Sequence, residues 1–175
     1  SKGMTVVGEL FEQREYFVPE VLMCADALKV GMDVLQPHVP RDEMKNKGQV
    51  ILGTVQGGVH DIGKNIVKLM LDVGGFTVHD LGKDVALPRF VEELDRTGAE
   101  VVAMSALMTT TMMAMKSAIK MIREVNPHVA IMLGGAPLTQ AIAQDFGADG
   151  FAETAARAVE ETERMVGLFK QRRGV

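Results

Sequence analysis

Apolar residues follow two different rhythms along the chain. Up to about residue 36 they recur every three or four positions, as in Val6, Leu10, Val21 and Leu28, which predicts amphipathic helices. Pro19 suits a first turn, so we expect a second helix to begin there. Two helices cannot bury a core alone. We therefore expect them to pack on the following domain, on another copy or on further helices, and we expect this chain, which lacks an initiator Met, to be a fragment.

A polar stretch separates these helices from the rest of the chain. "QPHVPRDEMKNKGQ" carries two prolines, mixed charge and a glycine, which is typical of a linker. The sequence thus predicts three parts: a helical-bundle cap over residues 1–36, truncated at its N-terminus, a linker over 37–48 and an α/β domain over 49–175.

From Gln49 onward short apolar runs alternate with amphipathic stretches. The predicted strands are "QVILGTV", "FTVHDL", "EVVAMSA", "VAIMLGG" and "GADGFA", and the predicted helices cover residues 61–73, 88–96, 111–125, 137–146 and 154–170. Five successive βα units predict an α/β fold, a Rossmann-like or flavodoxin-like five-stranded parallel sheet with helices on both faces. The first, third and fourth strands are apolar throughout, as in strands that are covered on both sides.

In such a fold, ligands bind beyond the carboxyl ends of the strands. The five loops there read "QGGVHD", "GKDVAL", "SALMTTT", "GGAPLT" and "AETAA". Their small residues let a large ligand approach the backbone. The helix that starts near Asp61 also offers free N–H groups and a positive dipole end.

Composition excludes some classes of function. The chain is 47% hydrophobic and 24% charged, as in folded globular proteins, and no apolar run reaches the roughly 20 residues that span a bilayer. A net charge of −4 with 5% aromatic residues argues against nucleic-acid binding. The single Cys24 cannot form an internal disulfide, and no export leader is visible, so we expect a cytoplasmic protein.

Three interpretations compete for "GTVQGGVHDIGKNIV", residues 53–67. Its glycines do not give the dinucleotide pattern G-x-G-x-x-G, and "GVHDIGKN" ends in Asn where a phosphate loop needs Ser or Thr for magnesium. The third interpretation makes His60 a metal ligand. The other histidines and Cys24 are scattered in the sequence, and a single protein ligand suits a metal that a macrocycle already holds.

The same stretch resembles the cobalamin-binding loop of corrinoid methyl-carrier proteins and of cobalamin-dependent methionine synthase. That family's signature is D-x-H-x-x-G, and His60 and Gly63 match it. The resemblance extends to "SALMTTT", "GGAPLT" and "AETAARAV", and it covers residues 5–166. It implies a bound cobalamin, as methylcobalamin or a related corrinoid. It also implies that His60 replaces the cofactor's own base below cobalt and that the displaced nucleotide tail enters a slot in the sheet.

The resemblance also implies a set of cofactor-binding residues. The first loop and the helix start supply Gly57, Gly58, Val59, His60, Asp61, Ile62 and Gly63. The later loops supply Ser105, Leu107, Thr109, Thr111, Gly134, Gly135 and Ala155. By position, Phe11 and Val18 of the cap fall where the family presents apolar side chains over the upper face of cobalt.

Gly58 departs from the family pattern. It stands where the family has an Asp that accepts a hydrogen bond from the ligand histidine. Such a partner fixes the tautomer and raises the basicity of the ligand. Our hypothesis is that His60 still binds cobalt but donates less electron density, with a water bridging Thr111 and His60. A plain backbone variant at Gly58 is the alternative.

The expected function is that of a corrinoid protein that carries a methyl group on cobalt between a substrate-specific methyltransferase and a second methyltransferase, which passes it to tetrahydrofolate or a thiol. A reductive activase is a further expected partner. No acid–base pair or nucleophile triad is visible, and the methyl donor stays open among methoxyaromatics, methylamines, betaines and methanol. Two other classes remain open: a fragment of a cobalamin-sensing regulator, and a small subunit of an adenosylcobalamin-dependent mutase, which normally lacks the cap.

Overall fold

The computed structural model describes residues 2–35, 47–58 and 62–174. The elements are α1 (Lys2–Glu12), α2 (Val18–Leu35), β1 (Gln49–Val55), α3 (Ile62–Gly74), β2 (Thr77–Val85), α4 (Leu87–Thr97), β3 (Val101–Ser105), α5 (Thr109–Val125), β4 (Ala130–Gly134), α6 (Gln140–Asp145), β5 (Gly150–Ala152) and α7 (Ala155–Arg173). Most of the predicted linker, residues 37–46, lies outside the described residues. The division into cap, linker and α/β domain stays a prediction.

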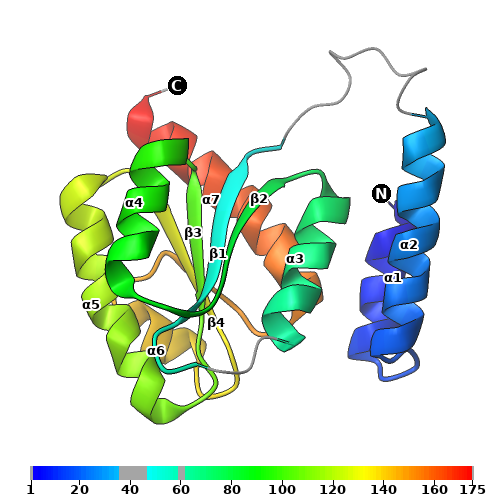
Figure 1. The fold of residues 1–175 in the computed structure, drawn as a ribbon, viewed down its shortest axis with the longest axis horizontal. Coiled ribbons are helices and arrows are strands. Elements are labelled where there is room, and N and C mark those ends of the chain that lie inside the picture. Colours follow the sequence, from blue (N-terminus) through cyan, green and yellow to red (C-terminus); the bar gives the residue numbers. More distant parts are fainter. Residues whose placement is uncertain (1, 36–46, 59–61, 175) are drawn as a thin grey trace.

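The five strands form one parallel sheet in the order β2-β1-β3-β4-β5. The strand order is that of flavodoxin-like folds, which confirms the predicted fold class. The helices α4 and α5 lie on one side of the sheet and α3 and α7 on the other (Figure 1). The order reverses between β1 and β3, so the carboxyl ends of these two strands define the switch point where such folds bind ligands.

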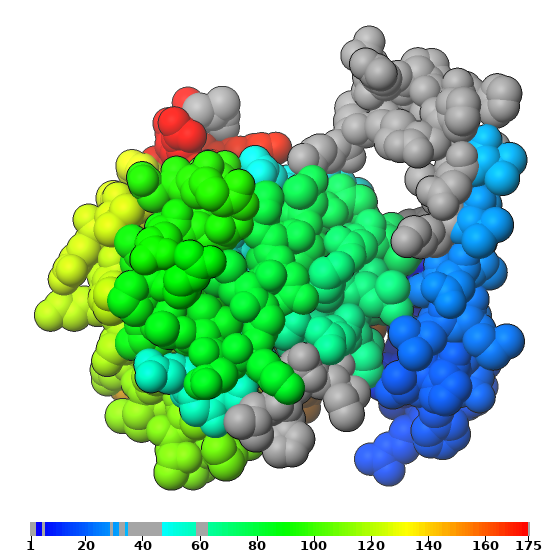
Figure 2. All heavy atoms as spheres, viewed as in Figure 1, coloured from blue at the N-terminus to red at the C-terminus, as the bar shows by residue number. Residues whose placement is uncertain are grey.

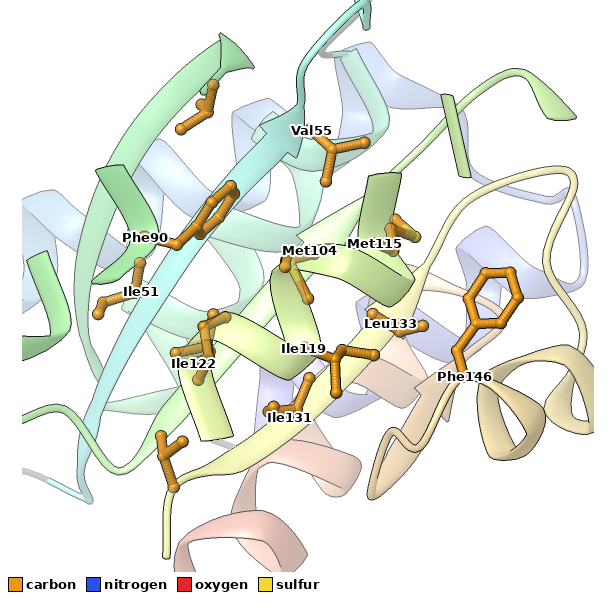
Figure 3. Close-up of a cluster of buried hydrophobic side chains, with 14 of the residues drawn as sticks. Ile51, Val55, Phe90, Met104, Met115, Ile119, Ile122, Ile131, Leu133 and Phe146 are labelled. Carbon is orange, nitrogen blue, oxygen red and sulfur yellow. The ribbon is translucent and has the colours of Figure 1, made fainter. Parts of the chain in front are cut away.

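Each central strand contributes to two cores, because consecutive side chains of a strand point to opposite faces. On the α4–α5 side, Ile51, Met104 and Ile131 pack with Phe90 of α4 and other buried residues (Figure 3). On the α3–α7 side, the neighbouring residues of the same strands pack against those helices. This double coverage explains why β1, β3 and β4 are apolar throughout, as their sequences predicted.

The strand β2 differs from the prediction. Its apolar run ends near Leu81, and "GKDVAL" was expected to be a loop, but pairing with β1 continues to Val85. The register shifts twice, and Gly82 and Asp84 adopt positive φ angles of 83° and 52°. The prediction was wrong because β2 is an edge strand whose bulged end carries polar residues while it still forms backbone pairs.

The helices α1 and α2 form a pair that packs beside α3 and α7 (Figures 1 and 2). The pair buries Met4, Val7, Val21 and Ala25 against two residues of α3, Ile66 and Met70. At Gly8, a Cβ atom would lie 2.9 Å from the Cβ of Ala156 in α7, so α1 and α7 approach closely. In the same region, Thr154 donates a hydrogen bond of 2.5 Å to Glu12 at the end of α1.

The remaining boundaries differ from the predictions by a few residues. The helix α5 begins at Thr109, two residues early, whereas α6 begins only at Gln140, after Thr139 caps it by accepting a hydrogen bond from the backbone N–H of Ile142. Pro19 lies in the first turn of α2, as predicted. None of the helices in the described ranges is both long and apolar enough to span a membrane.

Candidate functional site

A slot of about 350 Å³ opens at the carboxyl edge of the sheet on the α3–α7 side. Its walls are the ends of the central strands, the loops after β3, β4 and β5, the first turns of α3 and α7, and Phe11 of α1. Most lining side chains are apolar, and several of them are alanine: Leu52, Ile66, Val67, Ala103, Ala106, Leu107, Ala136, Ala152, Ala155 and Ala158 are among them. The slot lies at the edge where the strand order reverses.

Glycines shape the walls of the slot. At Gly63, in the first turn of α3, an added Cβ would meet no atom within 4 Å, so a larger side chain would project into open space. A Cβ at Gly134 would come to 3.2 Å from the carbonyl oxygen of Ala152. Gly135 has a φ of 120°, and its Cβ would lie 1.9 Å from the carbonyl oxygen of Ala106. Only glycine lets the loop after β4 lie this close to the loop after β3.

Four polar residues of the described ranges line the slot: Lys64, Ser105, Glu153 and Thr154. Ser105 ends β3, and its hydroxyl lies 2.9 Å from that of Thr54 on β1, which is fully buried. Lys64 of α3 is also buried, and its ammonium donates to both carboxylate oxygens of Asp80 at 2.7 and 2.9 Å and to Asn65 at 2.7 Å. A buried ammonium needs such partners, and the pair joins the start of α3 to β2.

Seven of the residues predicted from sequence line the slot together: Phe11, Gly63, Ser105, Leu107, Gly134, Gly135 and Ala155. Val18 does not line it; it packs with the buried residues of the α1–α2 pair. Ile62 begins α3, and Thr109 begins α5. Val59, His60 and Asp61 lie outside the described residues. The roles of all these residues toward a cofactor stay predictions.

The turn after β1 carries Gly57 and Gly58. The Gly58 amide donates to the carbonyl oxygen of Val55 at 3.0 Å, and the Gly57 amide donates to a carboxylate oxygen of Asp84 at 2.7 Å. A Cβ at Gly57 would lie 2.9 Å from the methyl group of Thr111, which therefore borders the turn. The hydroxyl of Thr111 donates to the carbonyl oxygen of Met108 at 2.9 Å.

Sequence reasoning missed four polar residues around this site: Thr54, Lys64, Asp80 and Asp84. Thr54 offered a signal, since it is the one hydroxyl residue within the apolar strand run "QVILGTV". Lys64 of α3 pairs with Asp80 of β2, and Asp84 of β2 binds the turn after β1. These partners lie 16 and 27 residues apart in sequence, and no local pattern reveals such pairs.

Comparison with known proteins decides the family. Residues 48–161 match a B12-binding domain, and residues 1–36 match a second B12-binding domain description. The chain is 44% identical over 168 residues to dimethylamine corrinoid protein 3 of Methanosarcina acetivorans, covering 95% of this chain and 79% of that protein. The chain belongs to the corrinoid proteins with a B12-binding domain.

Solved structures of corrinoid proteins have the same fold. A cobalamin-binding protein from Desulfitobacterium hafniense is similar with a TM-score of 0.81 and 32% identity, over 93% of this chain and 77% of the other. A chain from the crystal structure of a methanol:cobalamin methyltransferase complex of Methanosarcina barkeri is similar with a TM-score of 0.78 and 33% identity, over 94% of this chain and 63% of the other.

Proposed function

We propose that this corrinoid protein holds a cobalamin or related corrinoid in the base-off form, with His60 as lower cobalt ligand, and carries a methyl group between two methyltransferases. When bound, the corrinoid supplies a cobalt atom that accepts and releases the methyl group. The observation that carries the proposal is the slot, because seven residues that the family resemblance assigned to the cofactor line this one cavity.

The slot fits the nucleotide tail of such a cofactor. Its volume of about 350 Å³ lies within the range of pockets for small ligands, and its lining is mostly apolar, as a flat aromatic base requires. Ser105 offers a hydroxyl to the polar part of the tail. The alanines and glycines of the lining let the tail lie against the backbone.

The cap has a second task in this proposal. Phe11, which is half-buried, extends from the end of α1 into the lining of the slot, so α1 covers one side of the cofactor with an apolar side chain. The family resemblance assigns Phe11 and Val18 to an apolar cover above cobalt, a role in which exclusion of water protects a reactive reduced metal. In this structure Phe11 lines the slot and Val18 packs within the α1–α2 pair, so this assignment is proposed from the resemblance alone.

The proposed partners follow from the relatives. One relative is named for dimethylamine, and another belongs to a methanol:cobalamin methyltransferase complex. A substrate-specific methyltransferase is therefore proposed to load the methyl group, and a second one to pass it to tetrahydrofolate or a thiol. A reductive activase is proposed to restore cobalt that has become oxidised.

An absorption spectrum of the purified protein with added cobalamin tests the proposal. The wild type is expected to show a base-off, His-ligated spectrum, and His60→Ala is expected to lose it. His128→Ala is the matched control, because His128 is exposed and lies near the start of β4, at the opposite edge of the sheet. A His-ligated spectrum that survives in His60→Ala, or that is lost equally in His128→Ala, would contradict the assignment of His60.

A further inference from the structure

The end of β2 has an irregular backbone. Between Asp80 and Val85 the strand pairs with β1 through two register shifts, and Asp84 takes a left-handed φ of 52°. That region is uncommon for residues other than glycine, although Asp enters it more readily than most. A carboxylate of Asp80 accepts a hydrogen bond of 2.9 Å from the Gly82 amide, which stabilises the turn of the backbone toward Asp84.

Asp84 binds the turn after β1 at two points. Its carboxylate accepts the Gly57 amide at 2.7 Å, and its own amide donates to the carbonyl oxygen of Gly58 at 3.0 Å. Together these bonds hold the amide of Gly57 and the carbonyl oxygen of Gly58. The turn at Gly57 and Gly58 is therefore held by a residue of the neighbouring strand.

The turn itself excludes a side chain at position 58. A Cβ there would lie 2.4 Å from the methyl group of Thr54 and 3.0 Å from the carbonyl oxygen of Val55. Thr54 is fully buried and its hydroxyl pairs with Ser105, so it has little freedom to move away. The turn that Asp84 holds is thus one that a carboxylate at position 58 would disturb.

The same strand also holds the start of α3. Asp80 receives the buried ammonium of Lys64, two residues into the described part of α3, through both of its carboxylate oxygens. Gly58 and Lys64 flank the segment that carries His60. Both flanks are therefore tied to the last six residues of one edge strand.

We propose that Asp84 is a positioning residue for His60: from β2 it holds the turn at Gly57 and Gly58, after which the chain continues to His60. This inference rests on the proposed function. Asp84 acts through the backbone on either side of Gly58, and the Asp80–Lys64 ion pair holds the other flank. Removal of the Asp84 carboxylate then lets the preceding turn shift and weakens the alignment of the ligand with cobalt.

Three substitutions separate the hydrogen bond from the backbone conformation. Asp84→Ala removes the carboxylate. Asp84→Gly also removes it but relieves any strain of the positive φ angle. Asp84→Asn keeps an oxygen acceptor for the Gly57 amide and tolerates the same φ. Asp95→Ala, at an exposed position of α4, is the matched control for loss of a surface carboxylate.

Three measurements are made on the full chain. Amide hydrogen exchange without cobalamin follows Gly57 and Gly58 directly. Titration with cobalamin gives the affinity, and the electron paramagnetic resonance spectrum of the cob(II)alamin form shows whether a nitrogen ligand splits the cobalt lines. Asp84→Ala and Asp84→Gly are expected to exchange faster at Gly57, bind cobalamin about 10-fold more weakly and lose part of the nitrogen splitting, because loss of a supporting partner costs about 10–100-fold. Asp84→Asn and Asp95→Ala are expected to match the wild type.

The outcomes are distinct. Unchanged exchange in Asp84→Ala would overturn the anchoring of the turn. Faster exchange with unchanged affinity and unchanged nitrogen splitting would overturn the positioning role and leave the proposed function intact. If Asp84→Gly matched the wild type, the carboxylate would have no role. A wild type without nitrogen splitting would overturn the proposed function itself, and this would be seen before any substitution is made.

Discussion

Substitution of Gly58 by Ala tests whether glycine at this position is required by packing. The new Cβ would lie 2.4 Å from the Thr54 methyl group and 3.0 Å from the Val55 carbonyl oxygen. The φ of Gly58 is outside the left-handed region, so the expected effect comes from the clash and not from backbone strain. Overpacking in a tight site costs about 1–3 kcal/mol. The reduced entropy of the unfolded chain returns about 0.4–1 kcal/mol, so we expect Gly58→Ala to lower the free energy of unfolding by about 1–2 kcal/mol.

A double-substitution cycle identifies the clash partner. Thr54→Ser removes the methyl group and keeps the hydroxyl that pairs with Ser105. In the Thr54→Ser background, Gly58→Ala is expected to cost much less, with a coupling of about 1 kcal/mol, within the range for residues in contact. Equilibrium urea unfolding of the cobalamin-free protein, followed by circular dichroism, measures all four free energies.

The control and the refuting result are both clear. Gly63→Ala changes a glycine whose Cβ would meet no atom within 4 Å, so it is expected to leave the free energy of unfolding unchanged or raise it. If Gly58→Ala were as stable as the wild type, or if its effect were the same with Ser at position 54, the steric reasoning would be refuted. The family's Asp at this position would then be sterically admissible, and the original hypothesis of a simple missing partner for His60 would gain weight.

Three other predictions concern the slot, the cap and the pH dependence of stability. Gly63→Leu is expected to fill the slot and weaken cobalamin binding at least 10-fold in a titration, while urea unfolding shows an unchanged cobalamin-free fold; equal affinity would place the cofactor elsewhere. Gly8→Val is expected to separate α1 from Ala156 and speed proteolysis of the cap without lowering the stability of the sheet domain; unchanged cleavage would contradict the close contact. Burial alone raises the pKa of Asp149, but hydrogen bonds from Arg172, the Ile131 amide and Arg123 outweigh it and hold this pKa below its ordinary value. The ionised Asp149 carboxylate therefore stabilises the fold above a pH of about 4, and this stabilisation is lost as the pH falls through the lowered pKa. Asp149→Asn is expected to have a lower free energy of unfolding than the wild type at pH 7, with a difference that shrinks in acid. A difference that does not change with pH would contradict the lowered pKa.

Local patterns predicted most of the fold. The period of apolar residues located every strand, and β1 matched the predicted run from Gln49 to Val55. The fully apolar strands indicated a sheet covered on both faces, since apolar and polar residues alternate in a strand that has one solvent-exposed face. The end of β2 was predicted wrongly because the prediction relied on the apolar pattern alone. In this edge strand, backbone pairing with β1 continues to Val85, beyond the end of the apolar run.

The sequence by itself determined the family and seven of the residues that line the slot, because the motifs around Gly63, Ser105 and Gly134 are short and local. The tertiary structure decided how the site is supported. Gly58 is opposed by Thr54, and Asp84 reaches the same turn from a strand that pairs beside it. Such contacts join residues that are distant along the chain and adjacent only in the sheet, so no local pattern encodes them. The glycine that looked like a missing carboxylate is, in the folded chain, a position with no room for one.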